Sequence, residues 1–180
     1  SYHKMVEDKK IEKCDFLEEY LVKRTIRTQS GVAPISVLTK PYPCPGKCVF
    51  CPTEQGVPKS YLSNEPAVMR AILNEYDPYN QVITRLKALK LTGHNTDKCE
   101  VIVIGGTWSY LPHDYQEDFL KRCLDALNGR DSKSLEEAQK INETSKNRQV
   151  ALCLETRPDY ITPEEVARLR RYGCTRVEMG

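Results

Sequence analysis

The sequence has no apolar run that approaches the roughly 20 residues needed to cross a membrane. The segment Ser1 to Lys13 is charged throughout and lacks the apolar core and small-residue cleavage site of a secretory signal. We therefore expect a cytoplasmic protein without membrane association. In that compartment its eight cysteines are expected to be thiols rather than disulfides.

The sequence also has little net charge. Its 27 Lys and Arg residues against 25 Asp and Glu residues give a formal charge of +2, too small for a protein that binds nucleic acid by electrostatics alone. A local basic face is still available in LVKRTIRTQSG, where Lys23, Arg24 and Arg27 lie close together on any helix that contains them. These residues form either a nucleic-acid contact or an ordinary solvated helix face.

No internal repeat or low-complexity tract interrupts the sequence, so apolar periodicity locates the elements. The spacing from Val6 to Thr28 predicts a single amphipathic helix before Gly31. VAPISVLT, CEVIVIGG, VALCLET and CTRVEM predict four strands. Helices are predicted between the strands at residues 65–76, 79–91, 112–127 and 164–172, with another starting after Ser134.

Strands that alternate with helices predict right-handed βαβ units and a parallel sheet, so the fold class is α/β. Four such strands amount to half a barrel with an open edge. Residues 31–180 are therefore predicted to form the first part of an incomplete parallel (β/α) barrel, with a small doubly wound sheet as the alternative. Residues 1–30 are predicted to be a separate helical leader.

Three cysteines gather in one proline-rich loop directly after the first predicted strand. Cys44, Cys48 and Cys51 stand in PYPCPGKCVFCP, within a segment from Lys40 to Ser63 that cannot be regular structure. Loops at the carboxyl ends of parallel strands build active sites, and thiolates at this density select iron–sulfur clusters or zinc.

No second CxxC pair exists to complete an ordinary four-ligand zinc site. Three thiolates around a four-iron cube would leave one iron open, as a cluster that binds a substrate requires. The alternative is zinc, with His94 or His113 as the fourth ligand. The remaining cysteines are interpreted as small core residues.

The C-x3-C-x2-C spacing after a first strand, with Phe50 just before the last cysteine, resembles the radical S-adenosylmethionine (SAM) superfamily. The resemblance implies that Cys44, Cys48 and Cys51 hold a [4Fe-4S] cluster whose open iron chelates the amino and carboxylate groups of SAM. It also places Phe50 in the cofactor site. Reduction would then produce a 5'-deoxyadenosyl radical, chemistry that belongs to the cofactor.

Further motifs narrow the resemblance. From about Arg27 to Gly180 the chain is similar to the catalytic subunit of the Elongator complex and its single-chain bacterial and archaeal relatives. Some members have a longer interval between the first two cysteines, so the short interval suggests a prokaryotic type. The motifs, in order, are GVAPISVLTKPYPCPGKCVFCP, KSYLSNEPAVMRA, YDPYNQ, GHNTDK, VIVIGGTW, ETRPDY and YGCTRVEMG.

This family resemblance implies carboxymethylation of carbon 5 of the wobble uridine of tRNA. The acetyl methyl group of acetyl-CoA would lose hydrogen to the adenosyl radical, the carbon radical would add to uracil, and the thioester would be hydrolysed. The implied partners are tRNA, acetyl-CoA, a carboxyl-terminal acetyltransferase-like domain that is absent here, and Elongator-type subunits or a second copy of the chain. A zinc-stapled RNA-binding module without catalysis and a different radical SAM enzyme are the alternatives.

Candidate site residues follow from strand ends and from the resemblance. Gly105 and Gly106 end the second strand, where a ligand can approach the backbone, and Thr107 adds a hydroxyl. Glu155 and Arg157 follow the third strand and are predicted to grip the ribose and carboxylate of SAM, with an ion pair to Asp159 as the alternative for Arg157.

Other roles come from the resemblance or remain open. The family motif assigns Lys98, in GHNTDK, to acetyl-CoA. Lys23, Arg24 and Arg27 become candidate tRNA contacts. Glu178, inside the last strand, is predicted either to face the barrel interior as a polar ligand or to pair near Arg176.

Overall fold

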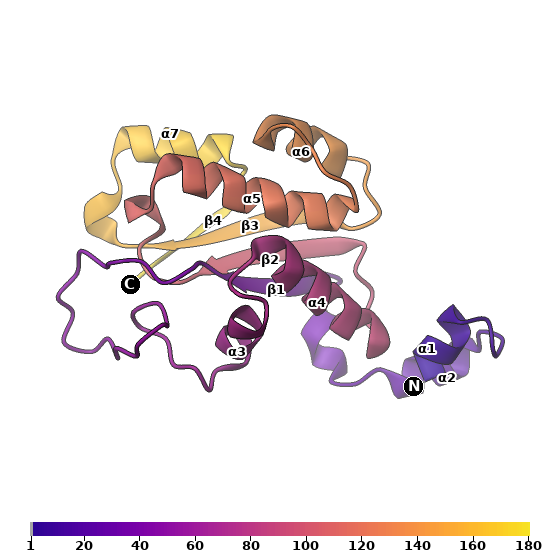
Figure 1. The fold of residues 1–180 in the computed structure, drawn as a ribbon. Coiled ribbons are helices and arrows are strands. Elements are labelled where there is room, and N and C mark those ends of the chain that lie inside the picture. The colour runs from indigo at the N-terminus through magenta and orange to yellow at the C-terminus, as the bar shows by residue number, and fades with distance from the viewer. Residues whose placement is uncertain (1) are drawn as a thin grey trace.

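Four parallel strands form a single curved sheet in the computed structural model, which describes residues 2–180 (Figure 1). The strands lie side by side in chain order. This arrangement confirms the predicted α/β class and the incomplete parallel barrel. The strands are β1 (Ala33–Leu38), β2 (Lys98–Ile104), β3 (Arg148–Thr156) and β4 (Arg176–Met179).

The helices between the strands have sequence-encoded starts. Ser134 accepts a hydrogen bond from the Glu137 amide, and Thr162 accepts one from the Glu165 amide, so both predicted capping positions are confirmed. Prolines begin three of the helices, where a missing N–H costs nothing. The helices are α3 (Pro66–Leu73), α4 (Pro78–Leu91), α5 (His113–Asn128), α6 (Leu135–Asn142) and α7 (Pro163–Arg171).

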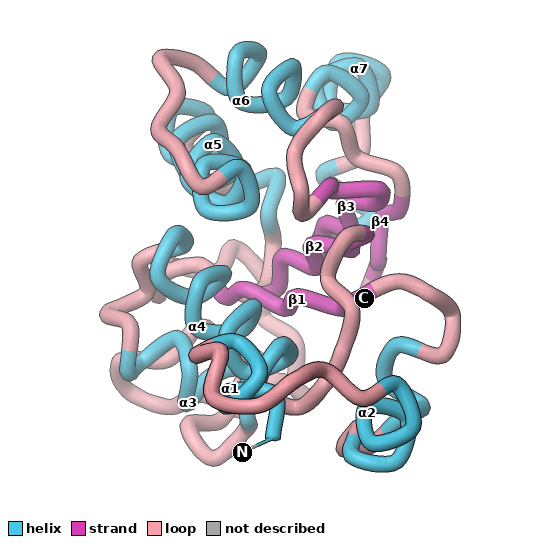
Figure 2. The backbone as a smooth tube through the Cα atoms, turned by 90° about the vertical axis from the view of Figure 1, so that its right-hand side faces the viewer, coloured by secondary structure: helices cyan, strands magenta, loops and turns pink. Residues whose placement is uncertain are grey.

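One apolar core lies between the sheet and helices α4 to α7. Ile35, Val101 and Leu152 face it from three neighbouring strands, and Phe119 and Leu169 enter it from α5 and α7. Figure 2 shows the helices arranged around one side of the sheet. Successive side chains along a strand point to opposite faces of the sheet, so only every second residue faces this core. The other face remains free to line a barrel interior.

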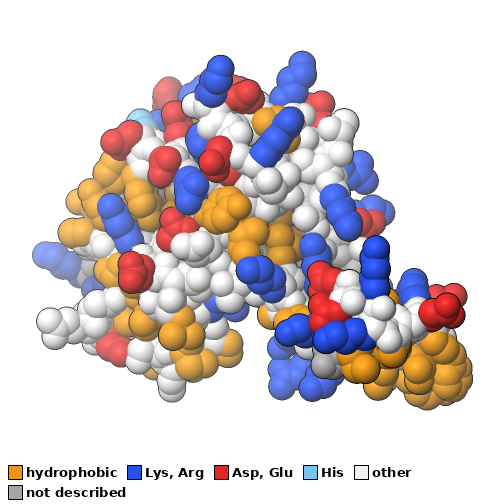
Figure 3. Space-filling view, turned by 45° about the vertical axis from the view of Figure 1, so that its right-hand side comes forward, with side chains coloured by type: hydrophobic (Ala, Val, Ile, Leu, Met, Phe, Trp, Pro, Cys, Tyr) orange, Lys and Arg blue, Asp and Glu red, His pale blue; other side chains and the backbone are white. Residues whose placement is uncertain are grey.

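The leader differs from the prediction. Instead of one amphipathic helix from Val6 to Thr28, it contains α1 (Tyr2–Glu7), α2 (Asp15–Leu21) and a 3₁₀ turn (Thr25–Thr28). Short helices are stable only when other parts of the protein pack against them, and few side chains pack against the apolar residues of the leader. The aromatic side chains of Phe16 and Tyr20 are 64% and 73% exposed, and Figure 3 shows hydrophobic groups on the surface of this protruding segment.

The outer edge of β1 is closed by side chains from α3 and α4. Arg70 donates to the Ser36 carbonyl at 2.7 Å, and Arg85 donates to the Pro34 carbonyl at 3.2 Å. The buried Gln81 amide bonds both backbone groups of Leu38 at 2.9 Å. The open edge expected from the sequence is therefore at β4, where strand pairing is unprotected.

No helix within residues 2–180 is both long enough and apolar enough to cross a bilayer.

Candidate active site

The cysteine loop follows β1 directly and runs without helix or strand from Thr39 to Glu65, as predicted. It folds over the carboxyl ends of the strands and encloses one side of a cavity of about 210 Å³. Polar groups from the ends of β2 and β3 form the other side. The cavity is lined by Cys44, Cys48, Cys51, Lys59, Ser60, Gly106, Thr107, Glu155, Thr156, Arg157 and Gly180.

Each of the three predicted sulfur ligands accepts a hydrogen bond. The Gly46 amide lies 3.4 Å from the sulfur of Cys44, and Arg157 Nη1 lies 3.4 Å from the sulfur of Cys48. The Ser60 hydroxyl donates to the sulfur of Cys51 at 2.9 Å. Donors directed at sulfur stabilise the thiolate, which is the form that binds metal.

Glu155 connects the end of β3 to the diglycine turn after β2. Its Oε2 atom accepts from the Gly105 amide at 3.1 Å, the Gly106 amide at 3.2 Å and the Tyr61 hydroxyl at 2.6 Å. Gly105 has φ +132°, and a Cβ there would collide with the Thr39 hydroxyl. Glycine is therefore required by both conformation and space.

Arg157 directly follows β3 and also lines the cavity. Its Nε and Nη2 atoms donate to the two carboxylate oxygens of Asp159 at 2.9 and 2.8 Å. The hydrogen bond and charge of Asp159 raise the pKa of Arg157, and Arg157 in turn lowers the pKa of Asp159. The ion pair considered as the alternative role for Arg157 is therefore present.

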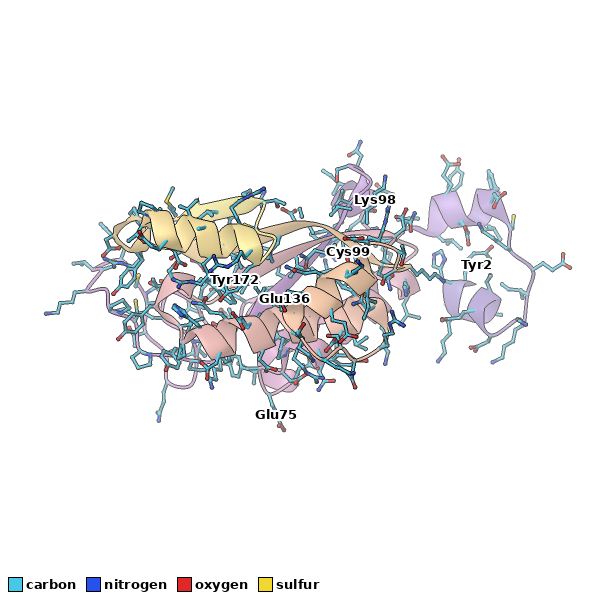
Figure 4. All side chains as sticks on the ribbon, turned by 90° about the horizontal axis from the view of Figure 1, so that it is seen from above. Tyr2, Glu75, Lys98, Cys99, Glu136 and Tyr172 are labelled. Carbon is cyan, nitrogen blue, oxygen red and sulfur yellow. The ribbon has the colours of Figure 1, made fainter. Side chains whose placement is uncertain are left out.

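Of three other predicted site residues, one lies inside the cavity and two lie outside it. The Thr107 hydroxyl lies 3.9 Å from the Cys44 sulfur, inside the cavity. The Phe50 side chain is 96% exposed and is not among the cavity's lining residues. Lys98 begins β2, so about seven residues of strand, on the order of 23 Å, separate it from the cavity. Figure 4 labels Lys98 and its neighbour Cys99.

The basic residues of the leader do not share a helix, because α2 ends at Leu21. Arg24 has φ +55°, and Arg27 lies in the 3₁₀ turn that follows. All three predicted cations, Lys23 included, are exposed. Their predicted grouping on one helix face is wrong, because the chain turns between them.

The zinc alternative finds no histidine at the cavity. His94 bonds Thr28 through Nδ1 at 2.8 Å, and neither His94 nor His113 lines the cavity. Within residues 2–180, no three His, Cys, Asp or Glu side chains are placed to hold one metal ion. A cluster would take each thiolate on a different iron, so it would not require the three sulfurs to meet at one point.

Four of the five other cysteines are buried core residues, as the sequence suggested, but the prediction is wrong for Cys14, which is exposed in the thinly packed leader. Burial raises the pKa of the thiols of Cys99, Cys123, Cys153 and Cys174, so these groups remain protonated near neutral pH. These four thiols lie in the core and do not line the cavity.

Sequence reasoning assigned no role to three consecutive residues of the loop. Lys59 and Ser60 line the cavity, and Lys59 donates to the Gly46 carbonyl at 3.3 Å. Tyr61 reaches Glu155. The available signal was their position in KSYLSN, polar residues in the same irregular segment as the cysteines.

Glu178 shares a sheet face with Glu155, its register partner on β3. Its carboxylate lies 3.2 Å from Arg176 Nη2, which also pairs with Glu100 at 3.0 Å. The pairing alternative for Glu178 is therefore present, and the ion pair lies on the same sheet face as Glu155.

A parallel α/β sheet with a three-cysteine loop at its carboxyl edge defines a class of cluster-binding enzyme. The sequence profile of the Radical SAM superfamily matches residues 42–180, and the chain belongs to this superfamily. Membership implies SAM and a [4Fe-4S] cluster as cofactors.

Particular relatives narrow the class. The chain is 51% identical to the tRNA uridine(34) acetyltransferase of Methanocaldococcus infernus, covering 97% of this chain and 33% of that protein. It is 39% identical to Elongator complex protein 3 of Schizosaccharomyces pombe, covering 92% of this chain and 33% of that protein. The chain thus spans about a third of the length of these relatives.

A solved structure has the same fold. The archaeal Elp3 of Methanocaldococcus infernus with an N-terminal deletion (1–46) superimposes with a TM-score of 0.66 at 43% identity. The match covers 83% of this chain and 28% of that one. The radical SAM superfamily and the fold expected from the sequence are confirmed.

Proposed function

We propose that this chain is the cluster-binding and SAM-cleaving part of an enzyme that carboxymethylates carbon 5 of the wobble uridine of tRNA, with acetyl-CoA as co-substrate. The observation that carries the proposal is the convergence of Cys44, Cys48 and Cys51 with the Glu155–diglycine junction on one cavity. Relatives named tRNA uridine(34) acetyltransferase support the choice of reaction.

Cys44, Cys48 and Cys51 would hold the [4Fe-4S] cluster. The hydrogen-bond donors at the three sulfurs provide the electrostatic environment that thiolate ligands need. When bound, the cluster and SAM would supply a carbon radical that removes hydrogen from a substrate. The protein's own contribution is to orient the reactants and keep water away from them.

The cofactor contacts would come from the strand ends. Gly106 and Thr107 offer backbone and hydroxyl groups to SAM, and Gly105 shapes the turn that presents them. Glu155 holds that turn through Oε2 and has a second carboxylate oxygen for the ribose hydroxyls. Phe50, exposed on the loop, would become a cofactor contact only when the loop closes over its ligands.

The tRNA contact is proposed at the leader, through Lys23, Arg24 and Arg27. Two further arginines, Arg70 and Arg85, support this location. Burial, together with the charges of Arg70 and Arg27, lowers the pKa of Arg85 to about 10. Phosphate groups would relieve this repulsion between like charges.

The remaining partners are also part of the proposal. Acetyl-CoA would reach Lys98 at the opposite end of the sheet from the cysteines. Elongator-type subunits or a second copy of the chain, and a cytoplasmic location, complete the expected setting. The acetyltransferase-like domain that the reaction requires is not formed by residues 2–180, which make up the leader and the sheet unit.

Anaerobic reconstitution with iron and sulfide tests the proposal. The 180-residue chain should bind four irons and, once reduced, cleave SAM slowly to 5'-deoxyadenosine and methionine. With acetyl-CoA and tRNA added, the 180-residue chain should not form 5-carboxymethyluridine in digested nucleosides, since residues 2–180 form no acetyltransferase-like domain to bind the acyl donor. A colourless protein with tightly bound zinc would refute the cluster. Formation of the modified nucleoside would refute the division of labour between domains.

A further inference from the structure

We propose that Arg157 is a fixed hydrogen-bond donor to the cluster-ligating thiolate of Cys48, and that it thereby sets how readily the cluster is reduced. The inference rests on the proposed function, because it assumes that Cys48 ligates iron. It differs from the role in binding the SAM carboxylate that the sequence suggested for this arginine.

The orientation of Arg157 is imposed by Asp159. A guanidinium group can pair side-on with a carboxylate, through Nε and one Nη nitrogen, by two parallel hydrogen bonds. In this protein that side is already used, because Nε and Nη2 meet the two oxygens of Asp159 at 2.9 and 2.8 Å. Nη1 is the nitrogen left over, and it points at the sulfur of Cys48 at 3.4 Å.

The cysteine loop is shaped to receive the guanidinium. Gly46 lies between Cys44 and Cys48, and a Cβ at this position would collide with Arg157 Nη1. The backbone of Gly46 is not among those with positive φ, so other residues could adopt its conformation. A side chain at position 46 would therefore displace the guanidinium from its place against the loop, whereas glycine leaves room for it.

These contacts limit what else Arg157 can do. A second carboxylate, such as that of SAM, could not form the side-on contact through Nε and Nη2 without displacing Asp159. The bidentate pair instead resembles the outer contacts that orient metal ligands, here with Asp159 holding Arg157 and Arg157 holding the sulfur.

The expected consequence of this contact is a change in how readily the cluster accepts one electron. Dithionite, as external reductant, gives an electron to the cluster, and no bond in the protein forms or breaks. The reduced cluster carries one more negative charge, so a cation and an N–H group at a ligand sulfur stabilise it more than the oxidised form. Arg157 should therefore raise the reduction potential.

The test is a potentiometric titration of the reconstituted chain, followed by electron paramagnetic resonance in the absence of SAM. Arg157→Gln should lower the equilibrium constant for reduction at least tenfold, which for one electron is about 59 mV. Gly46→Ala, which pushes the guanidinium away but keeps its charge, should shift the potential in the same direction. Arg157→Lys should shift it less, and Arg148→Gln, at the far end of β3, should not shift it.

Asp159→Asn leaves Arg157 charged but less firmly held, and it also removes one negative charge, so its shift should be smaller than that of Arg157→Gln. If Arg157→Gln fails to take up iron, Gly46→Ala and Arg157→Lys decide the question. Unchanged potentials together with weaker SAM binding would overturn the inference and restore the carboxylate role, while the proposed function would stand. A wild-type chain that binds no iron would instead refute the proposed function.

Discussion

The hydroxyl of Tyr61 lies 2.6 Å from Oε2 of Glu155, although 94 positions separate the two residues in the chain. The contact ties the cysteine loop to the end of β3. Burial, reinforced by Glu155, raises the pKa of Tyr61, so the phenol stays a donor over roughly pH 6 to 9, below its ordinary pKa of about 10. The same Glu155 oxygen holds the diglycine turn, so Tyr61 is in a position to fix the geometry of the cavity that we propose for SAM.

Tyr61→Phe should therefore weaken SAM binding several-fold and lower the free energy of unfolding by about 1 kcal/mol, the net value of one hydrogen bond. Isothermal titration with SAM and urea unfolding measure the two effects. Tyr76→Phe is the matched control, since its hydroxyl bonds the Gly56 carbonyl at 2.7 Å, a group outside the cavity lining. Equal effects on SAM binding in both variants would contradict a specific role for Tyr61.

Cys48→Ser should abolish assembly of the cluster and leave the fold intact. Cys48 is exposed in a loop outside the core, so its replacement creates no cavity. Iron analysis and the visible absorption of the reconstituted protein measure the loss, and circular dichroism checks the fold. Cys14→Ser, also exposed but in the leader, should still bind four irons. A Cys48→Ser protein that bound four irons and cleaved SAM would disprove the ligand assignment.

Reversing the charges of Lys23, Arg24 and Arg27 should weaken tRNA binding in a salt-dependent way. For every phosphate that the leader no longer neutralises, the slope of log affinity against log salt should become shallower by about 0.7 to 0.9. Filter binding over a salt series measures the slope. The same reversal at Lys133, Lys140 and Lys146, which are exposed around α6, controls for net charge. Unchanged affinity at low and moderate salt would return the leader residues to a solvated surface.

The buried cysteines should resist alkylation. Burial raises the pKa of Cys99 to about 12, and it also raises the pKa of the Cys123, Cys153 and Cys174 thiols. Iodoacetamide at neutral pH should therefore label only the four other cysteines of the cluster-free folded chain, and all eight after denaturation. Peptide mass spectrometry identifies the sites.

The same shifts predict how stability depends on pH. A thiol with a raised pKa binds its proton more tightly in the folded state, so the unfolded state ionises first. The free energy of unfolding should be insensitive to thiol ionisation below the ordinary pKa of about 8.5 and should fall as pH rises above it. Urea titrations between neutral and alkaline pH measure the change. A rise in stability above that pH would contradict the assignment of these thiols to the core.

The sequence alone determined the order of elements, the parallel sheet and the three-cysteine loop. These features depend on local signals, namely apolar runs, capping residues such as Thr162 and the prolines that keep the loop irregular. Prediction from the sequence failed at the leader, where apolar periodicity indicated one long helix. A short helix is stable only when a neighbouring surface packs against it, and periodicity does not report that packing.

The tertiary structure alone decided which groups share the cavity. Tyr61 meets Glu155 and Arg157 meets Cys48 because parallel strands bring their carboxyl ends to one edge, while the spacing of residues along the chain does not encode those pairings. The direction of a side chain also depends on its partner, as Asp159 shows by turning Arg157 toward sulfur. Hydrogen bonds across loops form only after the sheet has assembled, so no local pattern could have predicted them.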